Sequence, residues 1–277
     1  MDAQLNDLLS RGVSIPAQPG VLMAVAKALQ GDEVDVRELA REMTSDAGLT
    51  ALVFRLARSP RYGGGRVDNL EQAILRVGLR PVFSLARALA LKGVIGGDQL
   101  LLERFWARSN GVARYASAIA EERVAVCNIF PDQAYLAGVF HHCGVPLLAQ
   151  RFPAYQALYW ETEAAGAELN PAEEDRRVQM DHCVVGFLVA RHWGLPDFVA
   201  AAIRHHHELE DLEEFRARSM VAILQLALRL HHLDSGVDSP EWFRVHETVM
   251  EELGLYREGF EEYLDEIRER AALVEAV

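Results

Sequence analysis

The sequence contains no apolar run near the roughly 20 residues that a membrane-spanning helix needs. Its first residues lack a basic segment followed by an apolar one, so we expect no signal peptide. Only three of the 277 residues are cysteine, and no CxxC pair or other thiolate motif is present. Because scattered cysteines do not indicate a disulfide framework, we expect free, mostly buried thiols in a reducing, cytoplasmic environment.

Basic residues are also scarce. The chain has 28 Lys and Arg residues against 41 Asp and Glu residues, a formal net charge of −13. The imbalance lies mainly after residue 207, where 18 acidic residues accompany only 7 basic ones. A strongly acidic chain repels phosphate backbones, so we expect no nucleic-acid partner. We interpret the acidic C-terminal part as a solvated surface; the alternative is a docking face for a basic partner.

Strand signals are missing as well, since no alternating β-branched runs closed by tight turns occur. Ala, Leu, Glu and Arg, which are good helix formers, dominate instead. The pattern therefore predicts an all-α protein, with Asp35 as the N-cap of one early helix and Asp46 or Ser45 as the N-cap of the next. The helices are expected near 2–11, 20–30, 100–123, from Pro131 through Leu148, 153–166, 171–193, from Asp197 to the following histidines, 215–233, 240–253 and 256–275.

Several short motifs follow one another in a fixed order between residues 14 and 208. They are Ile15-Pro16 with Pro19, Asp46-Ala47-Gly48-Leu49, Arg58-Ser59 before Tyr62-Gly63, Ala73-Ile74 before Val77-Gly78, Trp106-Ala107-Arg108-Ser109, Ala137 to Gly144, Asp181-His182 before Gly186, Trp193-Gly194-Leu195-Pro196, and Ile203 to Glu208. In this order they resemble the HDOD domain family. The resemblance implies a multi-helix, HD-type array over residues 14–208, with an acidic helical extension, residues 209–277, packed on it.

HDOD domains are relatives of HD-type phosphohydrolases that generally lack the complete catalytic metal site and are linked to bacterial signalling. The catalytic relatives hold two metal ions bridged by the Asp of a His-Asp doublet, because a carboxylate has two oxygens. By this resemblance His141 matches the doublet's His, and His142 replaces its Asp. An imidazole offers a single lone-pair nitrogen, so it cannot bridge two ions in this way.

Three further positions depart from the catalytic pattern that the resemblance implies. Arg108 stands where catalytic relatives place a His, and a guanidinium cannot ligate a cation. Leu228 takes the place of a late Asp ligand, and Val145 that of a Lys. The retained positions are His182 and the pair His206 and His207.

The histidines allow two interpretations. We adopt the first, in which they are hydrogen-bonded polar side chains of a helical core and no cofactor is bound. The alternative is one divalent transition metal, Zn²⁺, Ni²⁺ or Fe²⁺, held by His141, His142 and His182 with His206 or His207. Cys143 and Cys183 flank these motifs and are expected to be inert buried thiols, with a redox pair as the alternative.

We therefore expect a non-enzymatic signal-transduction or scaffold module with a degenerate metal site, which acts through contacts with other signalling proteins. One alternative is a metal-dependent phosphohydrolase acting on a nucleotide or cyclic dinucleotide, which would need a bridging carboxylate near His141. Another is a sensor that binds a small ligand in the vestigial cleft, where Arg108 and Arg204 are candidate contacts. The sequence leaves the partner, the pathway and the oligomeric state open.

Overall fold

The computed structural model describes residues 8–20, 22–23, 25–26, 34–209, 212–237 and 239–274. Within these ranges the chain forms helices and no β-strand, which confirms the all-α prediction. None of the helices in these ranges combines the length and the apolar character that a membrane crossing requires. The helices expected near 2–11 and 20–30 lie largely outside the described residues.

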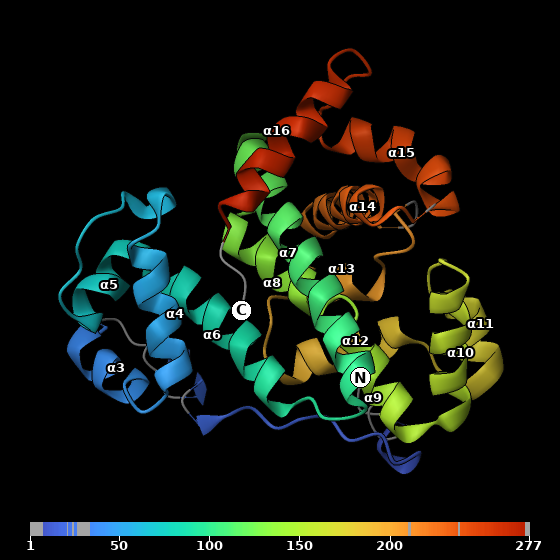
Figure 1. Ribbon diagram of the computed structural model, residues 1–277, viewed down its shortest axis with the longest axis horizontal. Helices are drawn as coiled ribbons and strands as arrows, with labels where there is room; N and C mark the ends of the chain where they lie inside the picture. Colours follow the sequence, from blue (N-terminus) through green and yellow to red (C-terminus); the bar gives the residue numbers. More distant parts are fainter. Residues whose placement is uncertain are drawn as a thin grey trace.

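The helices follow one another along the chain without intervening strands (Figure 1). They are α3 (Val36–Met43), α4 (Ala47–Ala57), α5 (Leu70–Val77), α6 (Leu79–Val94), α7 (Gln99–Cys127), α8 (Pro131–Phe140), α9 (Gly144–Arg151), α10 (Pro153–Ala164), α11 (Pro171–Val178), α12 (His182–His192), α13 (Asp197–Arg204), α14 (Phe215–Ser235), α15 (Pro240–Glu252) and α16 (Phe260–Ala272).

Asp35 forms the expected N-cap, and of the two candidates for the next helix, Asp46 and Ser45, the structure shows Asp46 as the cap. The Asp35 side chain accepts hydrogen bonds from the backbone N–H groups of Arg37 and Glu38 at the start of α3. The Asp46 side chain accepts one from the Leu49 N–H at the start of α4. Each carboxylate satisfies backbone donors that the first helical turn leaves without an intrahelical partner.

The long helix α7 runs through the middle of the molecule, with α3–α6 on one side and α10 and α11 on the other (Figure 1). α8 packs along it, and α14 and α16 from the acidic C-terminal part also pack against it. Gly138 makes the α7–α8 contact close, because a Cβ at this position would overlap the Ala113 backbone. The buried apolar side chains form one continuous core that extends from Leu8 to Ala271.

Trp193 joins two of the sequence motifs that lie far apart in the chain. Its indole Nε1–H donates to the Pro16 carbonyl oxygen at 2.7 Å, and its own carbonyl oxygen accepts from Gln18 Nε2 at 2.6 Å. The fully buried ring also packs edge-on against Phe140, with 5.8 Å between ring centroids. The proline-containing entry segment is thus held against the C-terminal end of α12.

Two helices that the sequence predicted as continuous are each broken in the structure. The helix expected from Pro131 through Leu148 ends at Phe140 and resumes at Gly144. The helix expected over 171–193 ends at Val178, because Gln179 adopts a left-handed conformation with φ 56°, and α12 starts only at His182. The two broken segments are in direct contact, since a Cβ on Gly144 would overlap the His182 carbonyl.

This close contact predicts that Gly144→Ala lowers the free energy of unfolding by about 1–3 kcal/mol, because either α9 or α12 must shift to make room. Urea denaturation measures the effect. Gly93→Ala is the matched control, because a Cβ there meets no heavy atom within 4 Å. The control should leave the stability unchanged or raise it by up to about 1 kcal/mol. Equal stability of the two variants would contradict the proposed contact.

Candidate functional site

The turn between α8 and α9 carries His141 and His142, and both side chains are buried. His141 Nδ1 lies 2.6 Å from the Gly138 carbonyl oxygen, one turn earlier in α8. In the part of the chain that the structure describes, Nε2 of His141 and Nε2 of His142 make no hydrogen bond. Buried imidazole nitrogens without a partner are uncommon, so each points to something that the protein atoms alone do not supply.

His182 is the first residue of α12, and the Asp181 side chain caps this helix. Its ring Nδ1 lies 2.7 Å from a carboxylate oxygen of Glu174, a residue of α11 that is completely buried. Glu174 also accepts hydrogen bonds from the His182 backbone N–H and from the Tyr155 hydroxyl. With these acceptor contacts the buried carboxylate is fully engaged, and His182 Nδ1 carries the proton.

His206 and His207 follow directly after α13. His206 Nδ1 donates to the Ile203 carbonyl oxygen at 2.8 Å, and the His206 carbonyl oxygen accepts from Gln225 Nε2 at 2.9 Å. His207 Nδ1 donates to a Glu241 carboxylate oxygen at 3.0 Å. Each Nδ1 therefore has its own acceptor, and in each neutral ring the lone pair is on Nε2.

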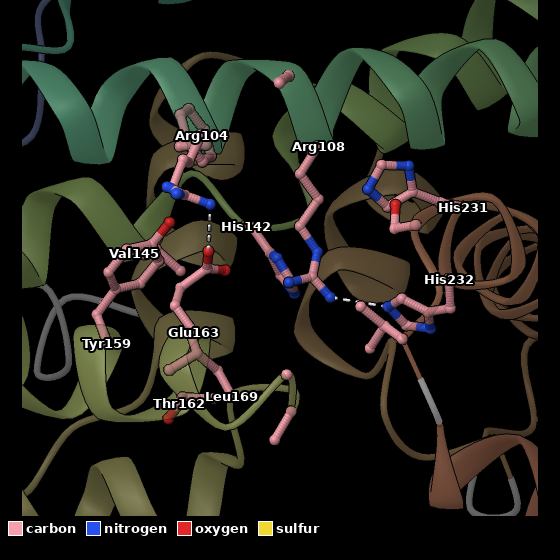
Figure 2. A pocket seen from close by; sticks show the side chains of 16 residues that line it. Arg104, Arg108, His142, Val145, Tyr159, Thr162, Glu163, Leu169, His231 and His232 are labelled. Atoms are coloured by element: carbon pink, nitrogen blue, oxygen red, sulfur yellow. Dashed lines mark hydrogen bonds and ion pairs between the residues drawn. The ribbon is translucent and has the colours of Figure 1, made fainter.

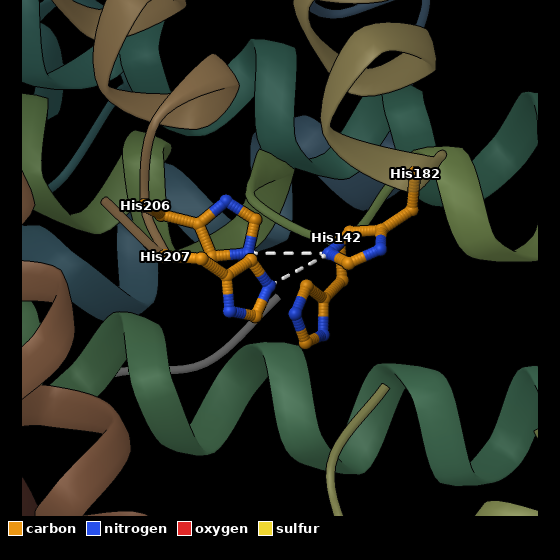
Figure 3. Close-up of side chains that lie close together, drawn as sticks. All are labelled: His142, His182, His206 and His207. Atoms are coloured by element: carbon orange, nitrogen blue, oxygen red, sulfur yellow. Dashed lines mark hydrogen bonds between the residues drawn. The ribbon is translucent and has the colours of Figure 1, made fainter. Parts of the chain in front are cut away.

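These Nε2 atoms converge (Figure 3). His182 Nε2 lies 3.3 Å from His206 Nε2 and 3.2 Å from His207 Nε2. Together with one nitrogen of His142, the candidate ligand atoms lie within 4.8 Å of one another. Lone pairs this close repel each other unless a proton or a metal ion lies between them. We refer to His142, His182, His206 and His207 as the histidine cluster.

The electrostatic environment divides the cluster into two parts. Burial lowers the pKa of His142 and of His206 well below the ordinary value, and neighbouring imidazoles lower it further. Burial acts in the same direction on His182 and His207. There, however, Cys183 and the carboxylates of Glu174 and Glu241 raise both pKa values, that of His207 to about 10. The His182–His207 side therefore attracts a positive charge, whereas His142 and His206 stay neutral.

The cluster fits a single transition metal ion, so the geometry favours the metal alternative over the interpretation without a cofactor that we adopted from the sequence. Two imidazole nitrogens on a tetrahedral Zn²⁺ ion, each about 2.0–2.1 Å from it, lie about 3.3 Å apart. The two Nε2 distances, 3.2 and 3.3 Å, match this separation. Imidazole donors suit Zn²⁺, Ni²⁺ or Fe²⁺ better than Mg²⁺. The carboxylates of Glu174 and Glu241 contact the outer Nδ1 atoms, as supporting groups of metal-bound histidines do.

The structure thus brings together four of the five histidines that the sequence singled out. His141 is the exception, because it does not belong to the group whose ligand atoms converge. Its ring lies beside the cluster, with its centroid 4.0 Å from that of His142. Of the two cysteines that flank these motifs, Cys143 and Cys183, each is a free, buried thiol.

The two candidate cleft arginines line different cavities. Arg108 lines a cavity of about 370 Å³ that extends to His142 (Figure 2). Its guanidinium forms an ion pair with Glu168 and lies 2.9 Å from His232 Nε2. Arg204 lines another cavity, of about 260 Å³, and its Nη1 lies 3.5 Å from Asp181 Oδ1. One ligand therefore cannot fill a single cleft that contains both arginines.

Sequence reasoning missed four residues that contact the cluster. Glu174 belongs to an acidic run that is typical of an exposed helix face, Glu241 lies far from His207 in the chain, and Cys183 was not considered as a ligand. Gln225, three residues before Leu228 on α14, also reaches the cluster through its hydrogen bond to the His206 carbonyl. The helix-capping residue Asp181, two residues before Cys183, was the only local signal for the start of α12.

The helical array and its buried histidines define an all-α protein of the HD type. The family model of the HDOD domain matches residues 15–209. The chain therefore belongs to the HDOD domain family, as its motifs indicated.

Solved structures share this fold over nearly the whole chain. An HDOD domain protein of unknown function from Geobacter sulfurreducens is 25% identical, with a TM-score of 0.68 and 98% of this chain and 97% of that chain covered. A protein of Marinobacter aquaeolei VT8, provisionally described as a signal transduction protein, is 24% identical, with a TM-score of 0.72 and coverages of 98% and 63%. A protein of Shewanella amazonensis SB2B, provisionally described as a metal-dependent phosphohydrolase, is 18% identical, with a TM-score of 0.69 and coverages of 99% and 97%.

A curated relative, an uncharacterized protein of Treponema pallidum (strain Nichols), is 24% identical over 220 residues. The match covers 78% of this chain but only 42% of that relative. The chain thus spans less than half the length of this relative.

The pH dependence of stability tests the ion pair between Glu168 and Arg108, which lies beside the cavity of about 370 Å³. Burial alone would raise the pKa of Glu168, but the His232 hydrogen bond and the Arg108 charge outweigh burial and lower the pKa to about 2. The resulting stabilisation is complete above the ordinary value of 4.5 and is lost as the pH falls towards about 2. Acidification from about pH 6 to pH 3 should therefore lower the free energy of unfolding of the wild type by about 2 kcal/mol more than that of Glu168→Gln.

Urea denaturation at each pH measures this difference. Glu247→Gln is the control, because its side chain is exposed, and it should follow the wild type. Parallel pH profiles of wild type and Glu168→Gln would show that the Glu168 ion pair does not contribute.

Proposed function

We propose that this chain is a cytoplasmic, non-enzymatic signalling module that acts through contacts with other proteins, and that its histidine cluster holds one divalent transition metal ion. The observation that carries the proposal is the convergence of Nε2 atoms whose Nδ1 atoms all have acceptors. The relative that is provisionally described as a signal transduction protein agrees with this role.

The same geometry argues against a pair of catalytic ions. A dinuclear hydrolytic centre needs a carboxylate that can bridge both ions. No carboxylate belongs to the group of converging ligand atoms in the described part of the chain. The two nearby carboxylates, Glu174 and Glu241, are used on the outer side, where they hold the Nδ1 protons of His182 and His207. His142 stands at the position that the bridging Asp takes in catalytic relatives.

A bound ion would act as a cross-link, because its ligands come from three separate places in the chain. His142 lies in the turn before α9, His182 at the start of α12, and His206 and His207 directly after α13. Imidazole ligation by His182, His206 and His207 requires no change of tautomer, since the hydrogen bonds at Nδ1 make Nε2 the ligating nitrogen. On His182 and His207 the metal would replace the proton that their raised pKa values favour. The metal would thus stabilise the arrangement of three helix ends on which the surrounding surface depends.

The metal proposal predicts that protein purified without chelators carries about one Zn²⁺, Ni²⁺ or Fe²⁺ ion per chain, or binds one on reconstitution. Elemental analysis after exhaustive dialysis measures the content. His207→Ala should lower the metal affinity by roughly tenfold or more, since loss of even a supporting group has such an effect. His246→Ala, at a half-buried histidine of α15 outside the cluster, is the control. A wild type that neither retains one of these metals nor binds one on reconstitution would overturn the proposal.

The non-enzymatic proposal predicts no hydrolysis of nucleoside triphosphates or cyclic dinucleotides above the background of a no-protein control. Product analysis by chromatography, with Mg²⁺, Mn²⁺, Fe²⁺ or Zn²⁺ added in turn, is the measurement. Turnover that persists through purification, and that His141→Ala or His142→Ala abolishes while His246→Ala does not, would establish the phosphohydrolase alternative instead.

A specific observation favours a second candidate function, that of a small-ligand sensor. The cavity of about 370 Å³ reaches His142 and is lined by Arg104, Arg108 and Tyr159. Both arginines are paired, Arg104 with Glu163 and Arg108 with Glu168, so an anionic ligand must compete with these carboxylates. Isothermal titration with nucleotides, using Arg108→Gln as the comparison, separates this function from the first.

A further inference from the structure

We propose that Cys183 is a thiolate ligand of the metal ion in the histidine cluster, so that the site is of mixed histidine and cysteine character. The inference rests on the metal binding proposed above and adds to it the identity of a ligand. It also adds the chemical class of ion, a borderline or soft transition metal such as Zn²⁺ or Co²⁺. Hard ions such as Mg²⁺ are disfavoured by thiolate and imidazole donors.

The position of the sulfur is the first observation. Cys183 follows His182 at the start of α12, and its side chain is buried. Its Sγ lies 3.5 Å from His182 Nε2, the nitrogen that faces the other imidazoles. It lies outside the set of atoms that are all within 4.8 Å of one another, and it is 3.9 Å from His206 Nδ1, the outer nitrogen of that ring. A sulfur and a nitrogen on one tetrahedral Zn²⁺ ion, at about 2.3 Å and 2.05 Å from it, would lie about 3.6 Å apart. The Cys183–His182 distance matches this value.

The second observation is independent of the cysteine. His142 Nε2 is buried and makes no hydrogen bond in the described part of the chain, although a nitrogen of this ring lies within 4.8 Å of those of His182, His206 and His207. This imidazole is directed towards the same space (Figure 3). An unpartnered nitrogen at this position indicates that the space between the rings accommodates a cation rather than only internal hydrogen bonds.

The supporting contacts explain why a thiolate is acceptable here. The Sγ atom lies beside His182 Nε2, where it would face a bound cation, and the thiolate is the form of cysteine that ligates metal ions. The Glu174 and Glu241 carboxylates are already engaged by Nδ1 protons, so they leave the negative contribution inside the cluster to Cys183. One thiolate would reduce the net charge of a bound divalent ion by one, which lowers the cost of burying that ion.

Cys183 also lines a cavity, although its side chain is buried. This cavity, of about 260 Å³, is lined by Arg204 and His207 as well. The thiol therefore lies between the cluster and the cavity, and a thiol reagent that enters the cavity can approach it. The other two cysteines, Cys127 and Cys143, are buried without lining any of the cavities described here.

Titration of the metal-free, full-length protein with Co²⁺ tests the inference, because Co²⁺ replaces Zn²⁺ and reports its ligands by absorption. We expect visible d–d bands of a tetrahedral ion and, in the near ultraviolet, a sulfur-to-cobalt charge-transfer band. Cys183→Ser should lose the charge-transfer band and bind Co²⁺ roughly tenfold or more weakly, whereas Cys127→Ser should behave as the wild type.

Thiol labelling of the wild type provides a second readout that does not depend on a variant. Bound Zn²⁺ should slow alkylation of Cys183, located by mass spectrometry, by about tenfold or more, because a metal-bound thiolate is a weaker nucleophile than a free one. Labelling of Cys127 should not change.

The outcomes separate the two proposals. Cobalt d–d bands without a charge-transfer band, and unprotected Cys183, would overturn the thiolate ligand and leave a histidine-only metal site. The absence of any cobalt band would overturn the metal site itself, and with it the ligand. A charge-transfer band that survives in Cys183→Ser but disappears in Cys127→Ser would place the sulfur ligand elsewhere.

Discussion

The geometry of the site depends on the hydrogen bonds at the outer nitrogens of three histidines. Glu174 holds the Nδ1 proton of His182, Glu241 that of His207, and the Ile203 carbonyl that of His206. Without these acceptors each ring could turn or change tautomer, and no set of lone pairs would face inward. Glu174 is the most constrained of them, because a buried carboxylate is tolerated only where its oxygens are hydrogen-bonded. It therefore ties α11, α12 and Tyr155 of α10 into one unit.

Our proposal of a non-enzymatic role rests on this use of carboxylates more than on the count of histidines. A carboxylate placed inside the cluster can bridge two ions, whereas one placed outside can only orient a ligand. Here the acidic groups are outside, and the position next to His141 holds the imidazole of His142. Arg108 is a further departure from the catalytic pattern, because it stands where catalytic relatives have a neutral, metal-binding His. Its charge forms an ion pair with Glu168 beside the cavity.

The sequence predicted the helical class, the early N-caps and the family, because these follow from local composition, capping residues and the order of motifs. It also selected the histidines that converge. It did not predict the two helix breaks at the site, since the residues 141–143 and Gln179 carry no glycine or proline that would mark a turn. Nor did it identify Glu174 or Glu241 as partners. A glutamate in an acidic run looks solvent-exposed, and only the tertiary fold brings Glu241 of α15 to His207.

The two helix breaks that the sequence did not predict also bring the segments that carry the cluster into contact with each other. Gly144 lets the turn after α8 contact the His182 backbone directly, so a displacement of either segment changes both. His142, in this turn, belongs to the cluster and at the same time lines the cavity that contains Arg108. A molecule that contacts His142 from the cavity and an ion that binds it from the cluster must therefore influence each other's affinity, and by the same factor in both directions. On our proposal that the cluster binds an ion, His142 is the residue through which the cluster and the cavity would be coupled.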